Sequence, residues 1–129
     1  MPSTHAIETI GNVTVLRLQD PRMFDFERIP ATTQLLDTFL KDSPTAKTLV
    51  NFGQIEFYNS MSLGLVAALG KKAERYGRTV SLCNLHPRSI WSIQATRLHT
   101  ALDIYHDEEL ALAGINGGAE SAESAAAAP

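Results

Sequence analysis

Cysteine and tryptophan are each used once in this sequence, and long apolar runs are missing. The single Cys83 excludes an intramolecular disulfide, which is typical of a reducing compartment. The longest mostly apolar stretch, Leu63 to Gly70, is far shorter than the roughly 20 residues that a membrane span needs. The first five residues also lack the basic and apolar regions of a signal peptide. These absences predict a cytoplasmic protein without a transmembrane segment.

The sequence also has fewer basic than acidic residues. Eleven Lys and Arg residues face fourteen Asp and Glu residues, for a formal net charge of -3, which argues against direct nucleic-acid binding. The four histidines are scattered and form no metal-ligand pattern. The sequence contains neither a GxxxxGK[ST] phosphate loop nor a GxSxG nucleophile motif. We therefore expect no metal, no cofactor and no enzymatic activity.

Hydrophobic periodicity predicts a single α/β domain that begins with a β-hairpin at Gly11-Asn12. Strands and helices then alternate in the order ββαβαβαβα, which favours a mixed, mostly parallel sheet of about five strands covered by about four helices. The predicted strands are Ala6–Ile10, Val13–Leu18, Lys47–Phe52, Thr79–Leu85 and Asp103–Tyr105. The predicted helices are Glu27–Lys41, Ser62–Tyr76, one from Pro87 through Leu98, and Asp107–Ala113.

The last residues differ in composition from the rest. Residues 1–113 carry the periodic pattern, whereas 114–129 consist mainly of Ala, Gly, Ser and Glu. Such a segment buries too little apolar surface to offset the entropy of ordering it. We expect a folded domain over 1–113 and a disordered tail over 114–129.

The segment from Leu49 to Leu65 carries the most information about function. A strand leads through a loop into Asn59-Ser60-Met61-Ser62-Leu63-Gly64 at a helix start. Asn59 or Ser60 can cap the exposed amides of that helix. A serine in this place is also accessible to a kinase, and a phosphate there adds about -1.5 to -2 charges. Both a structural cap and a phosphorylation switch fit these residues.

This segment resembles the signature of STAS domains in bacterial anti-sigma factor antagonists, and the resemblance extends from Val13 to Ala113. Lys72–Arg78, Asn84–Pro87 and Ile104–Ala111 agree with it in order and spacing. The resemblance implies a STAS fold and a protein-binding role. Its expected partner is an anti-sigma factor that is itself a serine kinase, with a serine phosphatase as a further candidate. In the family, phosphorylation releases the kinase, and the unphosphorylated domain binds it and frees the sigma factor.

The sequence departs from the STAS signature at the residue that is phosphorylated in the family. Met61 stands where the phosphorylated Ser or Thr is expected, and methionine cannot accept a phosphate. Asn59 replaces the usual aspartate, and Ser62 occupies a glycine position. Three interpretations follow: Ser60 or Ser62 is a shifted phosphorylation site, the domain binds its partner without a switch, or these residues only cap the helix.

Asp25, between Phe24 and Phe26, lies where family members often carry an acidic residue beside the switch site. A turn or helix-cap role is the simpler interpretation, and exposure of the two aromatic residues would favour an interface. The expected partner-binding residues are Asp25, Asn59, Ser60, Met61, Ser62 and Gly64. The alternative function is a ligand-binding or assembly subunit of a larger signalling or transport complex, without control of a sigma factor.

Two further residues are expected to pack in the hydrophobic core. Cys83 lies in an apolar strand without a basic activator, which predicts a buried, inert thiol. Trp91 shares helical spacing with Ile90 and Leu98, which predicts packing rather than partner binding.

Overall fold

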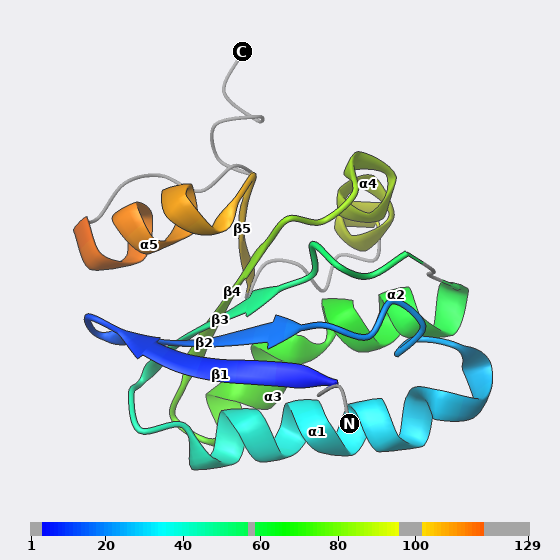
Figure 1. The fold of residues 1–129 in the computed structure, drawn as a ribbon, viewed down its shortest axis with the longest axis horizontal. Coiled ribbons are helices and arrows are strands. Elements are labelled where there is room, and N and C mark those ends of the chain that lie inside the picture. Colours follow the sequence, from blue (N-terminus) through cyan, green and yellow to red (C-terminus); the bar gives the residue numbers. More distant parts are fainter. Residues whose placement is uncertain (1–3, 57–58, 96–101, 118–129) are drawn as a thin grey trace.

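The computed structural model describes residues 4–56, 59–95 and 102–117. Strands and helices alternate along these ranges after an initial hairpin (Figure 1). The strands are β1 (His5–Ile10), β2 (Val13–Leu18), β3 (Lys47–Asn51), β4 (Thr79–Cys83) and β5 (Leu102–Tyr105). The helices are α1 (Ile29–Asp42), α2 (Ser60–Ala67), α3 (Leu69–Arg75), α4 (Pro87–Ala95) and α5 (Glu108–Gly117), and a short 3-10 helix, η1 (Phe26–Arg28), precedes α1. The predicted α/β class is confirmed.

All five strands form one sheet in the order β1-β2-β3-β4-β5. β1 is antiparallel to β2, and the other neighbours are parallel, as predicted. Right-handed crossovers between successive parallel strands place the connecting helices on one face of the sheet. Figure 1 shows α5, which follows the last strand, on the opposite side of the sheet from α1.

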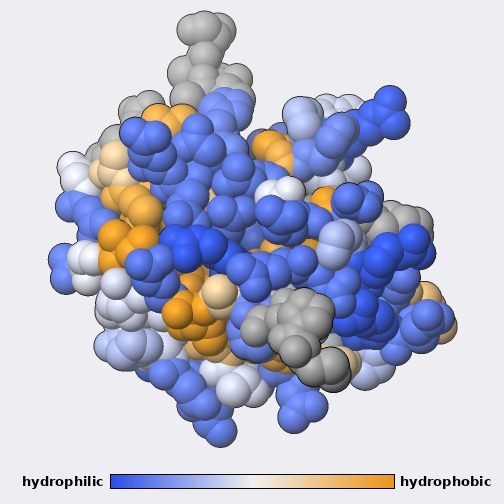
Figure 2. All heavy atoms as spheres, in the orientation of Figure 1, coloured by the Kyte–Doolittle hydropathy of each residue, from blue (hydrophilic) through white to orange (hydrophobic). Residues whose placement is uncertain are grey.

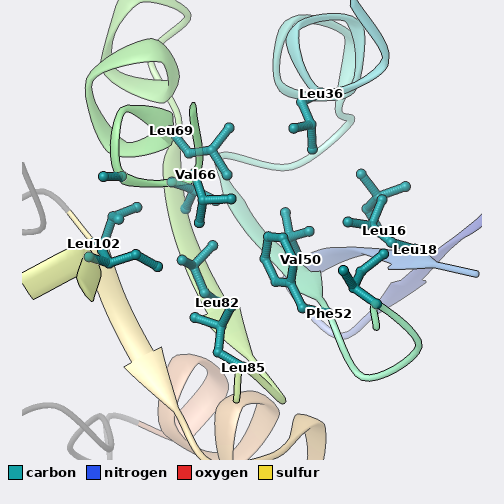
Figure 3. Packing of buried hydrophobic residues seen from close by; sticks show 14 of the residues in the cluster. Leu16, Leu18, Leu36, Val50, Phe52, Val66, Leu69, Leu82, Leu85 and Leu102 are labelled. Carbon is teal, nitrogen blue, oxygen red and sulfur yellow. The ribbon is translucent and has the colours of Figure 1, made fainter. Parts of the chain in front are cut away.

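Side chains alternate between these two faces along each strand. On the α1 side, Leu16, Val50 and Leu82 contribute to a large core with Leu36, Val66 and Leu69 from the helices (Figure 3). On the α5 side, a smaller core is formed by Val13, Val15, Leu49, Cys83, Tyr105 and Ala111. The strands β2, β3 and β4 are therefore buried on both faces, which explains their near-continuous apolar sequences.

The predicted helix Ser62–Tyr76 is wrong in its extent and continuity. It begins at Ser60 and divides at Ala68 into α2 and α3, so the described residues contain five α-helices where about four were expected. At Ala68, ψ is -6°, and the N–H contacts the carbonyl oxygens of Gly64, Leu65 and Val66. Apolar periodicity continues across this break because Val66, Leu69 and Ala73 all enter the same core.

The initial hairpin turns at Gly11-Asn12 as predicted. Gly11 has φ of 61°, which suits the first central position of a type II′ turn. The Asn12 N–H donates to Asn116 Oδ1 at 3.1 Å. This contact fixes the hairpin against the end of α5.

The carboxyl ends of the strands differ slightly from the prediction. β3 ends at Asn51 and β4 at Cys83, before the expected ends at Phe52 and Leu85. Asn84 stops β4 because it takes a positive φ of 61°, a conformation that asparagine tolerates better than most residues. Leu98, in the expected third helix, lies outside the described residues.

Helix α5 continues to Gly117, four residues beyond its predicted end at Ala113. Gly114 packs against the Tyr105 ring, and Ile115 packs on the smaller core. The predicted helix end missed this last turn because composition does not show that Ile115 packs against a cluster with residues of β2 and β3. Residues 118–129 lie outside the described part of the chain.

The predicted burial of Cys83 is confirmed, and its surroundings raise the pKa of the thiol to about 12, mainly through desolvation. A thiol with this pKa is a poor nucleophile at neutral pH. Within the described residues, no helix has the length and apolar character needed to cross a membrane.

The packing of Gly114 predicts a stability effect. A Cβ at this position would lie 2.6 Å from Tyr105 Cε1, so Gly114→Ala must displace a buried ring. We expect unfolding free energy to fall by about 1–3 kcal/mol, as in overpacked cores. Gly64→Ala is the matched control because its Cβ meets nothing within 4 Å, and it should be neutral or stabilising. Urea denaturation of both variants measures the difference, and equal stability would contradict the packing.

An ion-pair cluster at the start of α5 predicts pH dependence. Arg17 Nε and Nη2 donate to the two Glu108 carboxylate oxygens at 2.8 and 2.9 Å, and Asn51 Nδ2 donates to Oε1 at 3.1 Å. The Arg17 hydrogen bonds hold the pKa of Glu108 below its usual range. A lowered folded-state pKa stabilises the protein above the unfolded pKa, and the stabilisation is lost as pH falls through the folded pKa.

Glu108→Gln should therefore lower the unfolding free energy at pH 7 by about 1–2 kcal/mol. The gap between this variant and the parent protein should close as pH falls below about 4. Thermal denaturation at a series of pH values tests this, with Glu109→Gln, exposed on the same helix, as the control. A gap that persists undiminished at low pH would show that the carboxylate charge is not responsible.

Candidate functional site

The candidate site lies where β2 and β3 end and α2 begins (Figure 1). The carboxyl ends of parallel strands meet at one edge of a sheet, which is the usual place for binding sites in open α/β folds. The segment 19–28 follows β2, and the segment from Phe52 to Asn59 follows β3. The segment that the sequence analysis singled out therefore meets the Asp25 segment at this edge.

Asn59 and Ser62 cap each other at the start of α2. Asn59 Oδ1 accepts the Ser62 N–H, and Ser62 Oγ accepts the Asn59 N–H, both at 2.8 Å. Ser62 Oγ also donates to the Asn59 carbonyl oxygen at 2.8 Å. The expected cap by Asn59 is confirmed, and Ser62 completes a capping box at the position that glutamate or glutamine often holds.

Burial distinguishes Ser62 from its neighbour Met61. Ser62 is fully buried, whereas the Met61 side chain on the first turn of the same helix is 51% exposed. A kinase reaches a hydroxyl such as that of Ser62 only after the helix start has opened locally. The backbone of Ser60 begins α2, and its side chain lies outside the described part.

Asn59 also joins the two loops of the site. Its Nδ2 donates to the Phe24 carbonyl oxygen at 3.0 Å, and the Glu56 N–H donates to the Pro21 carbonyl oxygen at 3.1 Å. The Phe24 and Phe52 rings stack beneath them with centroids 6.0 Å apart. The Asp25 loop is thereby held against the start of α2.

Two ion pairs fix the shape of the Asp25 loop. Arg22 Nε donates to both Asp25 carboxylate oxygens, at 3.0 and 2.8 Å, and Arg28 pairs with Asp20 at 2.6 Å. The Arg28 hydrogen bond holds the pKa of Asp20 below its usual value. Asp25 precedes η1 at the N-cap position, but its side chain makes no capping hydrogen bond. Its carboxylate therefore has an ion-pairing role in this loop.

The two aromatic neighbours of Asp25 lie in opposite environments. Phe24 is fully buried in the large core, whereas Phe26 is 70% exposed. Exposure of both would have favoured an interface, and only Phe26 meets that condition. Phe26 and Met61 thus leave apolar side chains in solvent on the two segments that Asn59 joins.

Helix α4 packs beside α2 and corrects the prediction for Trp91. Ile93 enters the core and Ile90 packs against it, but Trp91 is 76% exposed. The prediction that Trp91 packs inside is wrong because helical spacing does not determine which side of a short helix faces inward. Trp91 is therefore an exposed aromatic side chain on the helix that neighbours α2.

A shallow hollow of about 370 Å³ separates α4 from α2 and the preceding loop. Its lining includes Leu63 and Ile55 together with the polar residues Glu56, His86 and Arg88. His86 Nδ1 accepts the Arg88 N–H at 3.1 Å, which uses it as a local cap. In the described ranges, no cluster of His, Cys, Asp or Glu could hold a metal ion.

Gly64, the remaining residue of the predicted set, lies in the second turn of α2 and is half-buried. The structure thus brings Asp25, Asn59, Met61 and Ser62 together and places Gly64 one turn further along α2. Sequence reasoning missed the exposure of Trp91. A lone tryptophan on a short helix beside the motif was the available signal.

Comparison with known proteins agrees with this geometry. The model of the STAS domain matches residues 4–111. An anti-sigma-factor antagonist (STAS) domain protein from Planctomyces limnophilus is 17% identical, with a TM-score of 0.68 over 86% of this chain and 97% of that chain. An anti-sigma factor antagonist from Mycobacterium paratuberculosis is 22% identical, with a TM-score of 0.69 over 87% and 92%.

SpoIIAA of Bacillus, in its phosphorylated form, is 20% identical, with a TM-score of 0.61 over 86% of this chain and 98% of that chain. No curated protein matches the sequence significantly. At these identities the solved structures show the shared fold, and the family model covers most of the chain. The chain belongs to the STAS domain family.

Proposed function

We propose that this chain binds a protein partner as an anti-sigma factor antagonist, through the start of α2 and the Asp25 loop. The observation that carries the proposal is Met61, half-exposed on the first turn of α2. It occupies the position at which the family's phosphorylated Ser or Thr is expected. An apolar side chain there favours contact with a partner, as aromatic and methionine residues do at interfaces.

The residues around Met61 support a preformed docking surface. The capping box fixes the direction of α2, and Asn59 fixes the Asp25 loop beside it. Because these contacts exist without a partner, little ordering entropy is lost on binding. Phe26 extends the exposed apolar surface on the adjoining segment.

The partner that we propose is an anti-sigma factor with serine-kinase activity. Solved structures of similar fold include SpoIIAA, an anti-sigma factor antagonist in phosphorylated and unphosphorylated forms. In this chain, Met61 cannot carry the phosphate, so binding by this surface is constitutive unless Ser60 serves as the acceptor. Ser62 is a poor acceptor because its hydroxyl is buried and makes the capping contacts.

Met61→Asp tests the docking surface. A carboxylate in place of the apolar side chain should weaken partner binding by about tenfold or more, because it must be desolvated at the interface. The thermal midpoint should stay nearly unchanged, since acidic residues are compatible with helix N-termini. Leu110→Asp, at an equally exposed apolar position on α5, is the control and should bind normally.

The partner is first recovered from native cell extract with the tagged chain and identified by mass spectrometry, and its affinity is then measured by calorimetry. Normal binding by Met61→Asp would place the interface elsewhere. Recovery of a membrane transporter or scaffold in place of an anti-sigma factor would favour the assembly-subunit function.

Phosphorylation is tested separately. Protein recovered from its native cells should carry phosphate on Ser60 or on neither serine, because the Ser62 hydroxyl is enclosed in the capping box. Phosphopeptide mapping distinguishes the two serines. Substantial phosphate on Ser62 would show that the start of α2 opens readily and would contradict a preformed docking surface.

A further inference from the structure

Strand β1 leaves one edge of the sheet open in the described part of the molecule. β1 and β5 are the two edge strands. Three of the four residues of β5 are buried, whereas Ile7, Glu8 and Thr9 of β1 are exposed. An edge strand that presents free N–H and C=O groups is a template for pairing with another strand.

The register of β1 against β2 determines which backbone groups face outward. The Gln19 N–H donates to the Thr4 carbonyl oxygen at 2.8 Å, one position beyond the pairing of His5 with Leu18. Hydrogen-bonded and non-hydrogen-bonded pairs alternate along an antiparallel ladder. The N–H and C=O groups of residues 5, 7 and 9 therefore point away from β2.

Ile7 stands at the centre of these three residues. It pairs with Leu16, so its side chain lies on the α1 side of the sheet, yet it is 53% exposed. A mainly apolar hollow of about 190 Å³ lies beneath it, lined in part by Leu35 and Phe39 of α1 and by Pro44. The free backbone edge and the incompletely covered apolar surface thus coincide.

We propose that β1 of a second copy of this chain pairs with this edge, antiparallel and about a two-fold axis at Ile7. The outward groups are arranged symmetrically about that residue, so Ile7 faces Ile7 of the other copy, and His5 faces Thr9 in both directions. This pairing keeps both isoleucines on the same face of a continuous ten-stranded sheet. A two-fold contact closes on itself and gives a dimer rather than a filament.

The charges of the edge are compatible with self-pairing. Glu8 is the acidic residue of β1, and its Oε1 accepts a hydrogen bond from Arg17 Nη1 at 2.7 Å. Arg17 also pairs with Glu108, but the register with Ile7 facing Ile7 places Glu8 opposite Ala6 of the other copy, so the two Glu8 carboxylates do not face each other across the axis. The dimer goes beyond the proposed partner binding and uses none of the residues assigned to it.

Sedimentation equilibrium over a wide concentration range tests the dimer. The parent chain should dimerise, and Ile7→Lys should raise the dimer dissociation constant by about tenfold or more, because the isoleucine is replaced by an ammonium at the axis. Thr9→Pro should weaken the dimer as well, because proline removes an outward N–H that β2 does not use. Leu110→Lys is the matched control on the opposite face of the sheet and should leave the dimer intact.

An engineered disulfide between two copies tests the register of the proposed β1–β1 pairing directly. The Cα atoms of a hydrogen-bonded antiparallel pair lie about 5.5 Å apart, within the range that a disulfide spans. Ile7→Cys should form a covalent dimer under mild oxidation, whereas Leu110→Cys should not. The native Cys83 does not interfere, because it is buried and its pKa is raised to about 12.

A parent chain that stays monomeric at every concentration would overturn the proposal. So would a dimer that Ile7→Lys leaves unchanged, or equal cross-linking of the two cysteine variants. Circular dichroism confirms that each variant is folded. None of these outcomes bears on Met61, so failure of the dimer leaves the proposed function to be decided by its own experiments.

Discussion

The side chain of Asn59 is the contact on which the arrangement of the candidate site depends. Its oxygen caps α2 through the Ser62 N–H, and its amide nitrogen holds the Phe24 carbonyl oxygen. One short side chain thus fixes the direction of a helix and the position of a loop 35 residues earlier in the sequence. An aspartate in this place could accept the capping hydrogen bond, but it has no N–H to donate to a carbonyl oxygen at neutral pH. The departure from the family pattern at Asn59 therefore has a structural consequence.

The start of α2 gives the neighbouring residues Met61 and Ser62 different environments. Ser62 turns inward and completes the cap, whereas the next residue toward the N-terminus, Met61, turns outward. A small hydroxyl suits the enclosed position because it satisfies the Asn59 N–H without leaving a cavity. An apolar, flexible side chain suits the outward position if this surface binds another protein, as proposed. The helix start is thus closed by a buried serine and presents an apolar side chain to solvent.

Most of the fold could be predicted because it rests on local patterns. The apolar runs of β2 to β4, the Gly11-Asn12 turn and the helical periodicity around Leu36 each depend on residues near one another in sequence. Features that depend on distant segments could not be predicted. The end of α5 contacts the Gly11-Asn12 turn through Asn116, and the Asp25 loop is held in place by Asn59. In the candidate site, the cap was predictable from residue type, but the exposure of Trp91 and the burial of Phe24 were decided by tertiary packing.

The two proposed surfaces lie on different parts of the same sheet. The proposed partner surface consists of loops at the carboxyl ends of β2 and β3, where Asn59 already holds the backbone in the unbound chain. Self-pairing uses the outer edge of β1, where the backbone itself supplies the contacts and Ile7 supplies the apolar centre. Because the surfaces share no residue, a dimer would carry two partner sites related by the same two-fold axis. A partner with two copies of its own binding surface would then bind such a dimer more tightly than a single site allows, because the second contact forms within the complex.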